Sequence, residues 1–340
     1  MARKRSPRSS KPSRATRSSR PSLFVRGTGR RRGRLFLWIN LLLLAGLAGW
    51  YVAQPEVRRQ EVNRLVANSL DRQKRVDPLD VAWDIYQLYY SPDFVAVAPP
   101  PGDRTHGYGG LPALVGDHAN TADGSLRLLA NRGYLVGYDD TLPAPRWVAY
   151  RVADLSPLPK AAERPDSFET DRRTVARVTG DAFTGTGYDR GHLAPNHAIA
   201  TRYGEEAQRE TFLLSNIIPQ KHGLNAGLWK QLEQRIATSY PARFGEVWVL
   251  AGPVFTRHPP HTLGRNGPAV PDACYMIILD ESDGRLRALA FIFPQDAKGE
   301  LDRHLTTIDT IEARTGLDFF SALEDSAETL LESQRASRVW

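Results

Sequence analysis

The stretch Tyr188-Asp189-Arg190-Gly191-His192-Leu193-Ala194-Pro195 decides how the rest of the chain is interpreted. Its Asp-Arg-Gly-His motif places an imidazole beside a guanidinium. A histidine with a pKa near neutrality can take a proton from water, and an arginine can neutralise charge that builds on a phosphate. Gly191 is expected to let the backbone come close to a ligand. We therefore expect a strand that leads into a site for phosphoryl chemistry.

Two later blocks belong to the same site. The first is Ser215-Asn216-Ile217-Ile218-Pro219-Gln220, and the second runs from Leu224 to Glu233. In the second block Leu224, Leu228, Leu232 and Ile236 recur every four residues, which predicts a helix with one buried stripe. Asn225, Trp229 and Glu233 recur at the same interval and form the next column of that helix.

Asn225 and Glu233 offer oxygen atoms to a metal ion. In a regular α-helix they would lie roughly 80° apart in azimuth and about 12 Å apart along the axis, too far to act as adjacent ligands. An amide oxygen that binds directly, with a carboxylate that holds the metal's waters, matches magnesium, which keeps much of its hydration shell. The pair therefore predicts Mg²⁺, or another divalent ion such as Mn²⁺.

Together these blocks resemble the DNA/RNA non-specific endonucleases of the ββα-metal, endonuclease G-like type. The resemblance spans roughly 133–323, because 133–139 and 145–150 look like the family's opening strands and 311–320 like its C-terminal helix and exit. It implies an α+β fold in which helices flank a central antiparallel sheet. It also implies a sugar-non-specific endonuclease that cleaves DNA and RNA and leaves 5′-phosphate ends.

The resemblance also implies roles for individual residues. His192 would be the general base, Asn225 the direct magnesium ligand and Glu233 a partner of the metal's waters, counted among the catalytic residues with Arg190. Asn216 would help shape the site. From their places in the motif blocks, Asp189 and Gln220 are also expected to bind substrate or shape the site.

The family's upstream catalytic arginine matches this chain only loosely. Arg164, together with Phe168 and Asp171, fits the family pattern best, and the competing candidates are Arg172, Arg173 and Arg177. The basic stretch 172–177 is equally well interpreted as a solvated loop or as a set of phosphate contacts.

The net charge of +7 comes from the N-terminus. Residues 1–34 contain 13 Lys and Arg and no acidic residue, which leaves 32 basic and 38 acidic residues afterwards, a balance of −6. The high pI therefore says little about the catalytic part, where phosphate attraction has to be local. A single cysteine, Cys274, excludes an intramolecular disulfide and a cysteine-based zinc site.

Residues 35–53 form an uncharged apolar run that is long enough to cross a bilayer. The basic tail before it predicts an uncleaved anchor with a cytoplasmic N-terminus and an extracytoplasmic catalytic domain. A bacterial periplasm is favoured, with the mitochondrial intermembrane space as the alternative. Nucleic-acid binding by the tail and a transit peptide remain open for residues 1–34.

The expected domains are a disordered tail (1–34), a transmembrane helix (35–53), a helical stalk and linker (54–110) and the endonuclease domain (111–335). The stalk is expected to pack on the domain. Expected partners are DNA, RNA, the membrane and a second copy of the chain in a homodimer. Two other functions stay open: a membrane-tethered nucleic-acid binder with an inactive site, and a phosphodiesterase that acts on small substrates.

Strands are also expected at 134–138, 147–152 and 247–251, the last one broken by Gly252-Pro253. Residues 273–279 and 286–293 should form a hairpin through the turn 280–284. A final amphipathic helix is expected from Leu301 to Ile311.

Overall fold

The structure is a computed structural model that describes residues 28–71, 73–74, 76–98, 100, 104–115, 126–264 and 267–340. Most of the basic tail expected over 1–34 lies outside these residues, as does much of the linker around 99–103. The chain divides into two units, Met1–Arg59 and Gln60–Trp340.

The first unit contains one long helix, α1 (Thr28–Val52). Within it, Arg34–Val52 is long and apolar enough to cross a membrane, and its side chains are not buried. Asn40, its single polar interruption, donates its side-chain amide to the carbonyl of Phe36 at 2.7 Å. Length and composition therefore suit either a membrane anchor or the apolar part of a signal sequence.

The second unit is built on an antiparallel sheet. Among the described residues eight strands join this sheet, and neighbouring strands all pair in the antiparallel sense. In spatial order they are β1 (Val95–Ala96), β10 (Arg285–Pro294), β9 (Ala273–Ser282), β8 (Glu246–Val254), β5 (Ala144–Ala153), β4 (Leu135–Asp139) and β3 (Arg127–Ala130), with β11 (Leu305–Thr306) paired to β10. The expected α+β fold with a central antiparallel sheet is confirmed.

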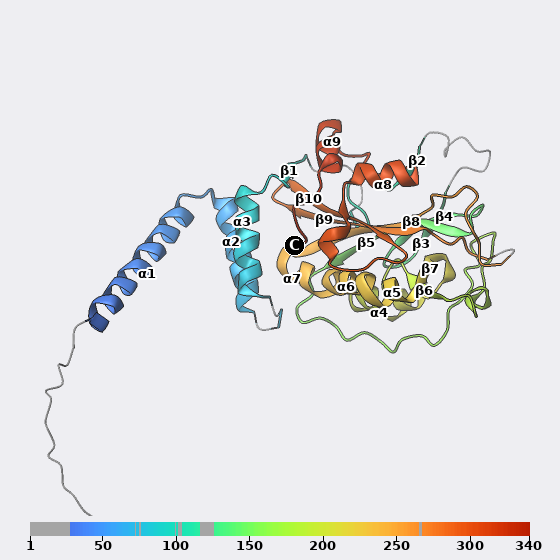
Figure 1. The fold of residues 1–340 in the computed structure, drawn as a ribbon, viewed down its shortest axis with the longest axis horizontal. Coiled ribbons are helices and arrows are strands. Elements are labelled where there is room, and N and C mark those ends of the chain that lie inside the picture. Colours follow the sequence, from blue (N-terminus) through green and yellow to red (C-terminus); the bar gives the residue numbers. More distant parts are fainter. Residues whose placement is uncertain are drawn as a thin grey trace, which may run out of the picture. The chain divides into compact units, whose positions relative to one another are not determined.

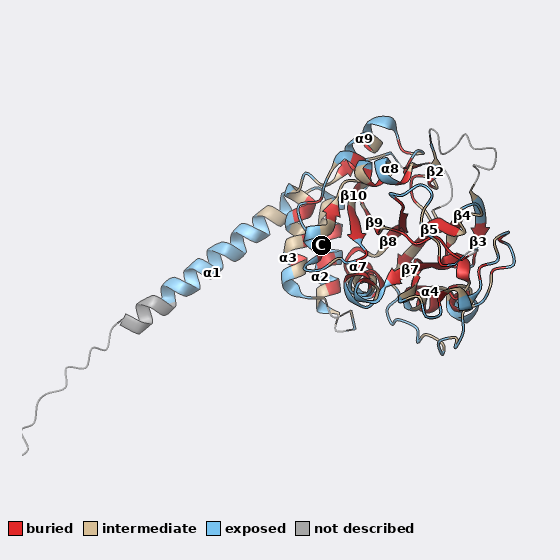
Figure 2. Cartoon of the chain, turned by 45° about the vertical axis from the view of Figure 1, so that its right-hand side comes forward, coloured by how far each residue is buried: buried red, intermediate tan, exposed pale blue. Residues whose placement is uncertain are grey.

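Helices cover both faces of this sheet. One face carries α4 (Asn196–Glu210), α5 (His222–Leu224), α6 (Lys230–Gln234) and α7 (Tyr240–Phe244), and the other carries α8 (Ile308–Thr315) and α9 (Asp325–Ser333), as Figure 1 shows. Successive strand residues therefore enter different cores, so that Val249 packs on the first face and Leu250 on the second. The central strands are buried throughout, whereas the helices expose their outer sides (Figure 2).

The segment expected to be a stalk contributes helices α2 (Glu56–Leu70) and α3 (Pro78–Tyr90). From Gln60 onward it belongs to the compact unit, as the expectation of packing required. Asp84 of α3 and Arg243 of α7 form a buried ion pair at 2.6 Å. Breaking such a pair costs about 3–5 kcal/mol, so this contact ties α3 firmly to the end of the long helical run that carries Asn225 and Glu233.

Three details of the expected strands and helices change. Strand β8 continues through Gly252 and Pro253 to Val254. Among the described residues only β9 pairs with it there, so the missing N–H of Pro253 breaks no pairing with β5. The expected helix from Leu301 begins only at Ile308, after a short 3₁₀ turn (Leu301–His304) and strand β11. The hairpin of β9 and β10 is confirmed, with longer strands and a tighter turn at Asp283-Gly284.

Candidate active site

A small hairpin followed by a helix carries the motif residues. Strand β6 (Tyr188–His192) pairs antiparallel with β7 (Ile217–Lys221), so that His192 faces Ile217 and Asp189 faces Gln220. A continuous helical run from His222 to Phe244 follows directly. This order of strand, strand and helix is the ββα arrangement that the sequence led us to expect. A further two-stranded pair, β2 (Ala113–Leu114) with β12 (Leu317–Asp318), lies outside it.

Asn216 fixes the turn that leaves β6. Its side-chain nitrogen donates to the carbonyls of Ala194 at 3.0 Å and Thr211 at 2.9 Å, and its oxygen accepts from the amide of Ala194 at 2.8 Å. The side chain is fully buried, so each of these bonds replaces water that is no longer available. Asn216 therefore shapes the site from beneath.

The motif residues meet in one cleft of about 420 Å³. Its lining is dominated by polar side chains from β6, from the start of α4 and from the helical run after β7. The lining residues are Arg164, Arg190, His192, Pro195, Asn196, His197, Ala198, Asn225, Ala226, Lys230, Glu233, Gln234 and Ala237.

His192 lines this cleft with a ring that is largely enclosed by aromatic side chains. Its ring packs against Phe168 at 5.4 Å and Phe212 at 5.1 Å between centroids. Its Nε2 is shielded from solvent and has no hydrogen-bond partner among the described residues. Burial, reinforced by the positive charge of Arg164, lowers the pKa of His192 from its ordinary 6.5 to about 3. The imidazole is therefore neutral at pH 7 and able to accept a proton.

Asp189 orients the side chain of Asn225. Its Oδ2 lies 2.9 Å from Asn225 Nδ2 and 2.9 Å from His222 Nδ1. Because an ionised carboxylate only accepts hydrogen bonds, the nitrogen of Asn225 must face Asp189. That assignment leaves Asn225 Oδ1 available as a metal ligand. It gives Asp189 a structural role, which is to hold the Asn225 amide in this orientation.

Glu233 is held beside the histidine by Trp229. The indole Nε1 donates to Glu233 Oε1 at 3.0 Å and to the carbonyl of His192 at 3.1 Å, so one group links the helix to the end of β6. Burial raises the pKa of Glu233 to about 8, against smaller opposing effects of Trp229, Lys230 and Arg164. A carboxyl group in this environment gains from a nearby cation.

Two arginines line the cleft. Arg190 donates to the carbonyl of Gly180 at 2.6 Å, while its Nε has no partner among the described groups. Arg164 lies over the ring of Phe212, with its guanidinium carbon 5.2 Å from the ring centroid. Of the competing candidates, Arg173 is held by Asp171 at 2.7 Å, and neither Arg172 nor Arg177 is among the described residues that line the cleft. The geometry favours Arg164.

Residues 113–326 match the model of the family described as DNA/RNA non-specific endonuclease. The chain belongs to the DNA/RNA non-specific endonuclease family. It is similar to the mitochondrial nuclease EXOG of Xenopus laevis, with 30% identity over 70% of this chain and 68% of that protein. It is also similar to human mitochondrial endonuclease G, with 29% identity over 58% of this chain and 70% of that protein.

A solved structure supports the same assignment. The chain resembles the crystal structure of the EndoG/EndoGI complex with a TM-score of 0.53 and 25% identity, over 65% of this chain and 91% of that chain. Other relatives are matched over less of their length: the chain spans 60% of the EXOG of Danio rerio and 57% of that of Mus musculus.

The helix of this family member departs from the regular geometry assumed from the sequence. Asn225–Trp229 and Arg235–Ser239 are π-helical, and Gly227 has non-helical dihedrals (φ −101°, ψ −113°). The leucine stripe is nevertheless buried as expected. A π segment rotates the residues after it relative to an α-helix, so the angle and spacing estimated for Asn225 and Glu233 do not apply. Both side chains line the same cleft.

Four polar residues of the cleft were missed in the sequence. Asn196 and His197 open α4, Lys230 stands three residues before Glu233, and Gln234 directly follows Glu233. The Oδ1 of Asn196 is buried without a partner among the described residues. The sequence did place them near the site, because Asn196 and His197 directly follow the motif and Lys230 lies in the helix that carries Asn225 and Glu233. The helical spacing used to select residues did not include them.

Gly191 has a different role from the one expected. A Cβ at this position would lie 2.1 Å from Oε1 of Gln220, so the glycine makes room for a buried side chain and not for a ligand. Gln220 in turn places its Nε2 3.5 Å from Sγ of Cys274. Gln220, expected to bind substrate or shape the site, is not among the described lining residues and supports β6 from below.

This packing makes Gly191→Ala a test of the hairpin. We expect the variant to lose about 1–3 kcal/mol of unfolding free energy, because the new methyl group overpacks against Gln220. Urea unfolding of the full chain in detergent measures the loss. Gly223→Ala is the matched control, since a Cβ there meets nothing within 4 Å. Equal stability of the two variants would contradict the packing argument.

Asp189→Asn tests the orientation of Asn225. A neutral amide at position 189 can present either donor or acceptor to Asn225, so Oδ1 of Asn225 is no longer directed into the cleft. We expect a 10–100-fold weaker response to divalent metal, the usual effect of losing a group that orients a ligand. Cleavage rates over a Mg²⁺ titration measure it. His222→Ala removes the other partner of Asp189 and should change the titration much less.

Proposed function

We propose that the protein is a divalent-metal-dependent, sugar-non-specific endonuclease that hydrolyses phosphodiester bonds of DNA and RNA. The observation that carries this proposal is the meeting of His192, Asn225 and Arg190 in one cleft. An unprotonated imidazole, an amide oxygen held free by Asp189 and a guanidinium suit hydrolysis of a phosphate ester. Family membership supports the same reaction class.

The cleft fits a hydrated magnesium ion, the cofactor that the family implies. Asn225 Oδ1 would hold it directly, because the nitrogen of that amide is engaged by Asp189. Glu233, whose pKa is raised by burial, would hold its waters. When bound, the ion supplies positive charge next to the reacting phosphate. Manganese offers similar chemistry at the same oxygen ligands.

The side chains of the protein divide the remaining work. His192 takes a proton from the attacking water, and its ring is held for this task between Phe168 and Phe212. Arg190 and Arg164 bind non-bridging phosphate oxygens, and an anionic phosphate so placed offsets the effect of Arg164 on the pKa of His192. The attacking water displaces the 3′ oxygen in line, the departing oxygen takes a proton from solvent water, and the phosphate stays on the 5′ end.

Indifference to the sugar agrees with the composition of the cleft. Its side chains are suited to phosphates, which carry no sequence information. The positive charges of Arg164, Arg190 and Lys230 lie locally at the cleft, in a portion of the chain whose overall balance is negative.

The N-terminal helix supports a membrane-tethered form of this nuclease. We place Arg34–Val52 across a membrane with the N-terminus in the cytoplasm and the catalytic unit on the other side. The relatives named EXOG and endonuclease G are called mitochondrial, whereas a bacterial periplasm satisfies the same topology. The homodimer and the expected domain boundaries stay predictions.

The proposal is tested with the full chain in detergent, supercoiled plasmid and single-stranded RNA. We expect both to be cleaved in Mg²⁺, with ends that a ligase can rejoin directly because they carry 5′-phosphates, and neither to be cleaved in a chelator. Retention of DNA on a gel without cleavage would favour the inactive binder. Hydrolysis of a small chromogenic phosphodiester without cleavage of polynucleotides would favour the small-substrate enzyme.

A further inference from the structure

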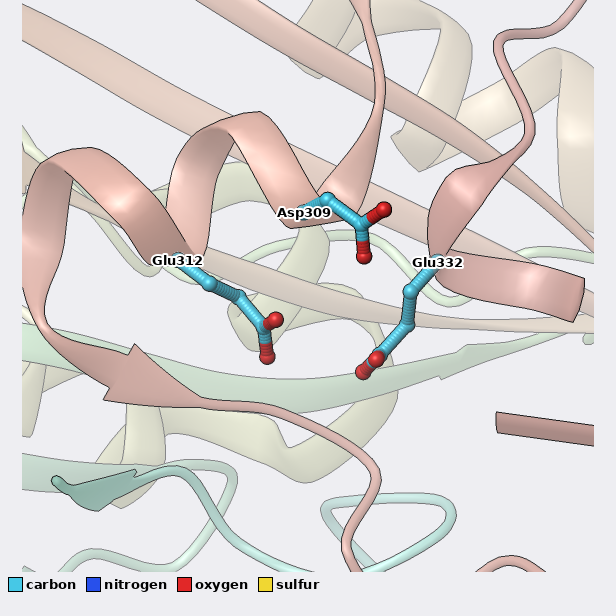
Figure 3. A group of neighbouring side chains, drawn as sticks. All are labelled: Asp309, Glu312 and Glu332. Atoms are coloured by element: carbon cyan, nitrogen blue, oxygen red, sulfur yellow. The ribbon is translucent and has the colours of Figure 1, made fainter. Parts of the chain in front are cut away.

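A second group of metal-ligand side chains lies between α8 and α9, among residues separate from those that line the catalytic cleft. Asp309 and Glu312 stand three residues apart on one face of α8, and Glu332 comes from the last turn of α9. One carboxylate oxygen from each lies within 4.8 Å of the other two. Figure 3 shows the three side chains directed toward a shared space.

The negative charge of this cluster is not balanced by the protein. Among the described residues, none of the three carboxylates forms an ion pair with a lysine or arginine. Burial first, and then Asp318, Asp309 and Glu328, raise the pKa of Glu312 to about 7. Burial and neighbouring carboxylates also raise the pKa of Glu332 to about 9. The site thus favours a positive partner.

Glu332 supplies a second, independent indication that this cluster binds a ligand. The residue is only 7% exposed, and its Oε1 has no hydrogen-bond partner among the described residues. It also lies in the last turn of α9, where the helix dipole disfavours an anion and where no basic residue is present. Leaving a buried carboxylate oxygen unpaired is costly, so this oxygen favours a cation or a hydrogen-bond donor as its partner.

We propose that Asp309, Glu312 and Glu332 bind a calcium ion. Ligands of Ca²⁺ lie 2.3–2.6 Å from the ion, so two oxygens of one coordination sphere can be up to about 5 Å apart, which accommodates the 4.8 Å limit of this cluster. Mg²⁺ demands near-ideal octahedral geometry and keeps several of its waters, so it is less suited to a site that offers three carboxylates from two helices. Three carboxylates and no nitrogen or sulfur also match a hard cation.

The surroundings suit partial hydration of such an ion. Asp309 is exposed, so water can reach the cluster and complete the six to eight ligands that calcium takes. Glu312 Oε1 accepts the amide of Phe319 at 2.8 Å, which fixes the orientation of its carboxylate and leaves Oε2 for the ion. An open site of three acidic ligands predicts an affinity in the range of about 0.1–1 mM, like that of extracellular calcium modules.

The ion would brace the C-terminal segment against the domain. Glu332 lies beyond residues 113–326, which match the family model, whereas Asp309 and Glu312 lie within them. After α9 the chain ends at Trp340, which packs edge-on against Tyr240 and Phe244 of α7. Calcium would therefore fasten this C-terminal segment to α8 on the second face of the sheet.

Calcium titration of the full chain in detergent tests this proposal. The buffer contains saturating Mg²⁺ so that the catalytic cleft is filled, and binding is followed by isothermal calorimetry and by thermal unfolding. We expect one Ca²⁺ per chain and a rise in Tm of about 5–10 °C at 100-fold excess over Kd. Glu332→Gln and Asp309→Asn should each weaken binding at least 10-fold, while Mg²⁺-dependent cleavage of DNA stays unchanged.

Glu300→Gln is the matched control, since it removes the charge of an exposed carboxylate outside the cluster and should leave calcium binding unchanged. Because Asp309 is exposed, Asp309→Asn tests the site even if Glu332→Gln fails to fold. Absence of calcium binding up to about 10 mM, well above the affinities of such sites, would overturn the proposal. So would binding that persists in both variants, which would place the ion elsewhere.

Discussion

His192→Ala is expected to lower the rate of cleavage of DNA and RNA by about 10²–10⁴-fold, the usual contribution of a general base. The imidazole of His192 lies at the end of β6, and its Nε2 has no hydrogen-bond partner among the described residues. Initial rates on plasmid and on RNA, at saturating Mg²⁺, measure the loss.

We expect the fold to survive this change, because the hydrogen bonds that link residue 192 to β7 and to the helical run are made by its backbone. Its carbonyl accepts the indole N–H of Trp229, and its strand pairs with β7. Loss of the ring removes packing against Phe168 and Phe212, so circular dichroism and thermal unfolding accompany the assay.

His197→Ala is the matched control. His197 also lines the cleft, and burial followed by the charge of Arg202 lowers the pKa of His197 too, so the two histidines share an environment but not a position in the motif. We expect its rate to fall far less. A larger loss of rate in His197→Ala than in His192→Ala would show that His192 is not the general base.

The sequence predicted the sheet because its signals were local. Alternating and continuous apolar runs, with turn residues between them, located β4, β5, β8 and the β9–β10 hairpin. The predicted end of β8 at Gly252 was wrong because the described part of β5 does not pair with Gly252 and Pro253, so a proline is tolerated there. Which residues a neighbouring strand pairs with cannot be known from one segment.

The identity of the site residues was more predictable than their geometry. His192, Arg190, Asn225 and Glu233 were selected by residue type and motif, and all four line one cleft. The role of Gly191 was not predictable, since it depends on Gln220, whose side chain reaches it only through the pairing of β6 with β7. The π-helical turns were also hidden, because an apolar repeat of four residues is compatible with regular α-helix.

The proximity of Arg164 to His192 could not be predicted from the spacing of residues in the sequence. Arg164 is 28 positions from His192 in a segment without helix or strand, so no periodicity could link the two. The fold brings them together through Phe212, which touches both the imidazole and the guanidinium. Four arginines were equally available by charge; the family pattern favoured Arg164 only loosely, and among the described residues Arg164 is the one of the four that lines the cleft.

Asn225→Ala is the second change with a large expected effect. It removes the oxygen that Asp189 directs into the cleft, so we expect cleavage to fall at least 100-fold and the response to Mg²⁺ to shift to higher concentration. Rates over a Mg²⁺ titration, together with calorimetric Mg²⁺ binding, measure both effects. Gln234→Ala, another exposed lining residue, is the control and should titrate like the unmodified chain.

Asn225→Asp separates ligand chemistry from orientation. A carboxylate is a good magnesium ligand, but at this position it would face Asp189, whose Oδ2 lies 2.9 Å from the amide nitrogen that it replaces. Repulsion between the two carboxylates should therefore prevent rescue. Full activity of Asn225→Asp would show that the oxygen needs no amide partner and would contradict the role given to Asp189.

Combining the two large changes tests whether His192 and Asn225 serve one reaction. Groups that act on the same step are not additive, so His192→Ala/Asn225→Ala should be scarcely slower than the worse single variant. His192→Ala alone should bind Mg²⁺ with unchanged affinity, whereas Asn225→Ala should not, because only the amide is a proposed ligand. Losses that multiply in the double variant would instead mean that the two side chains act independently, which would contradict the single shared step proposed for them.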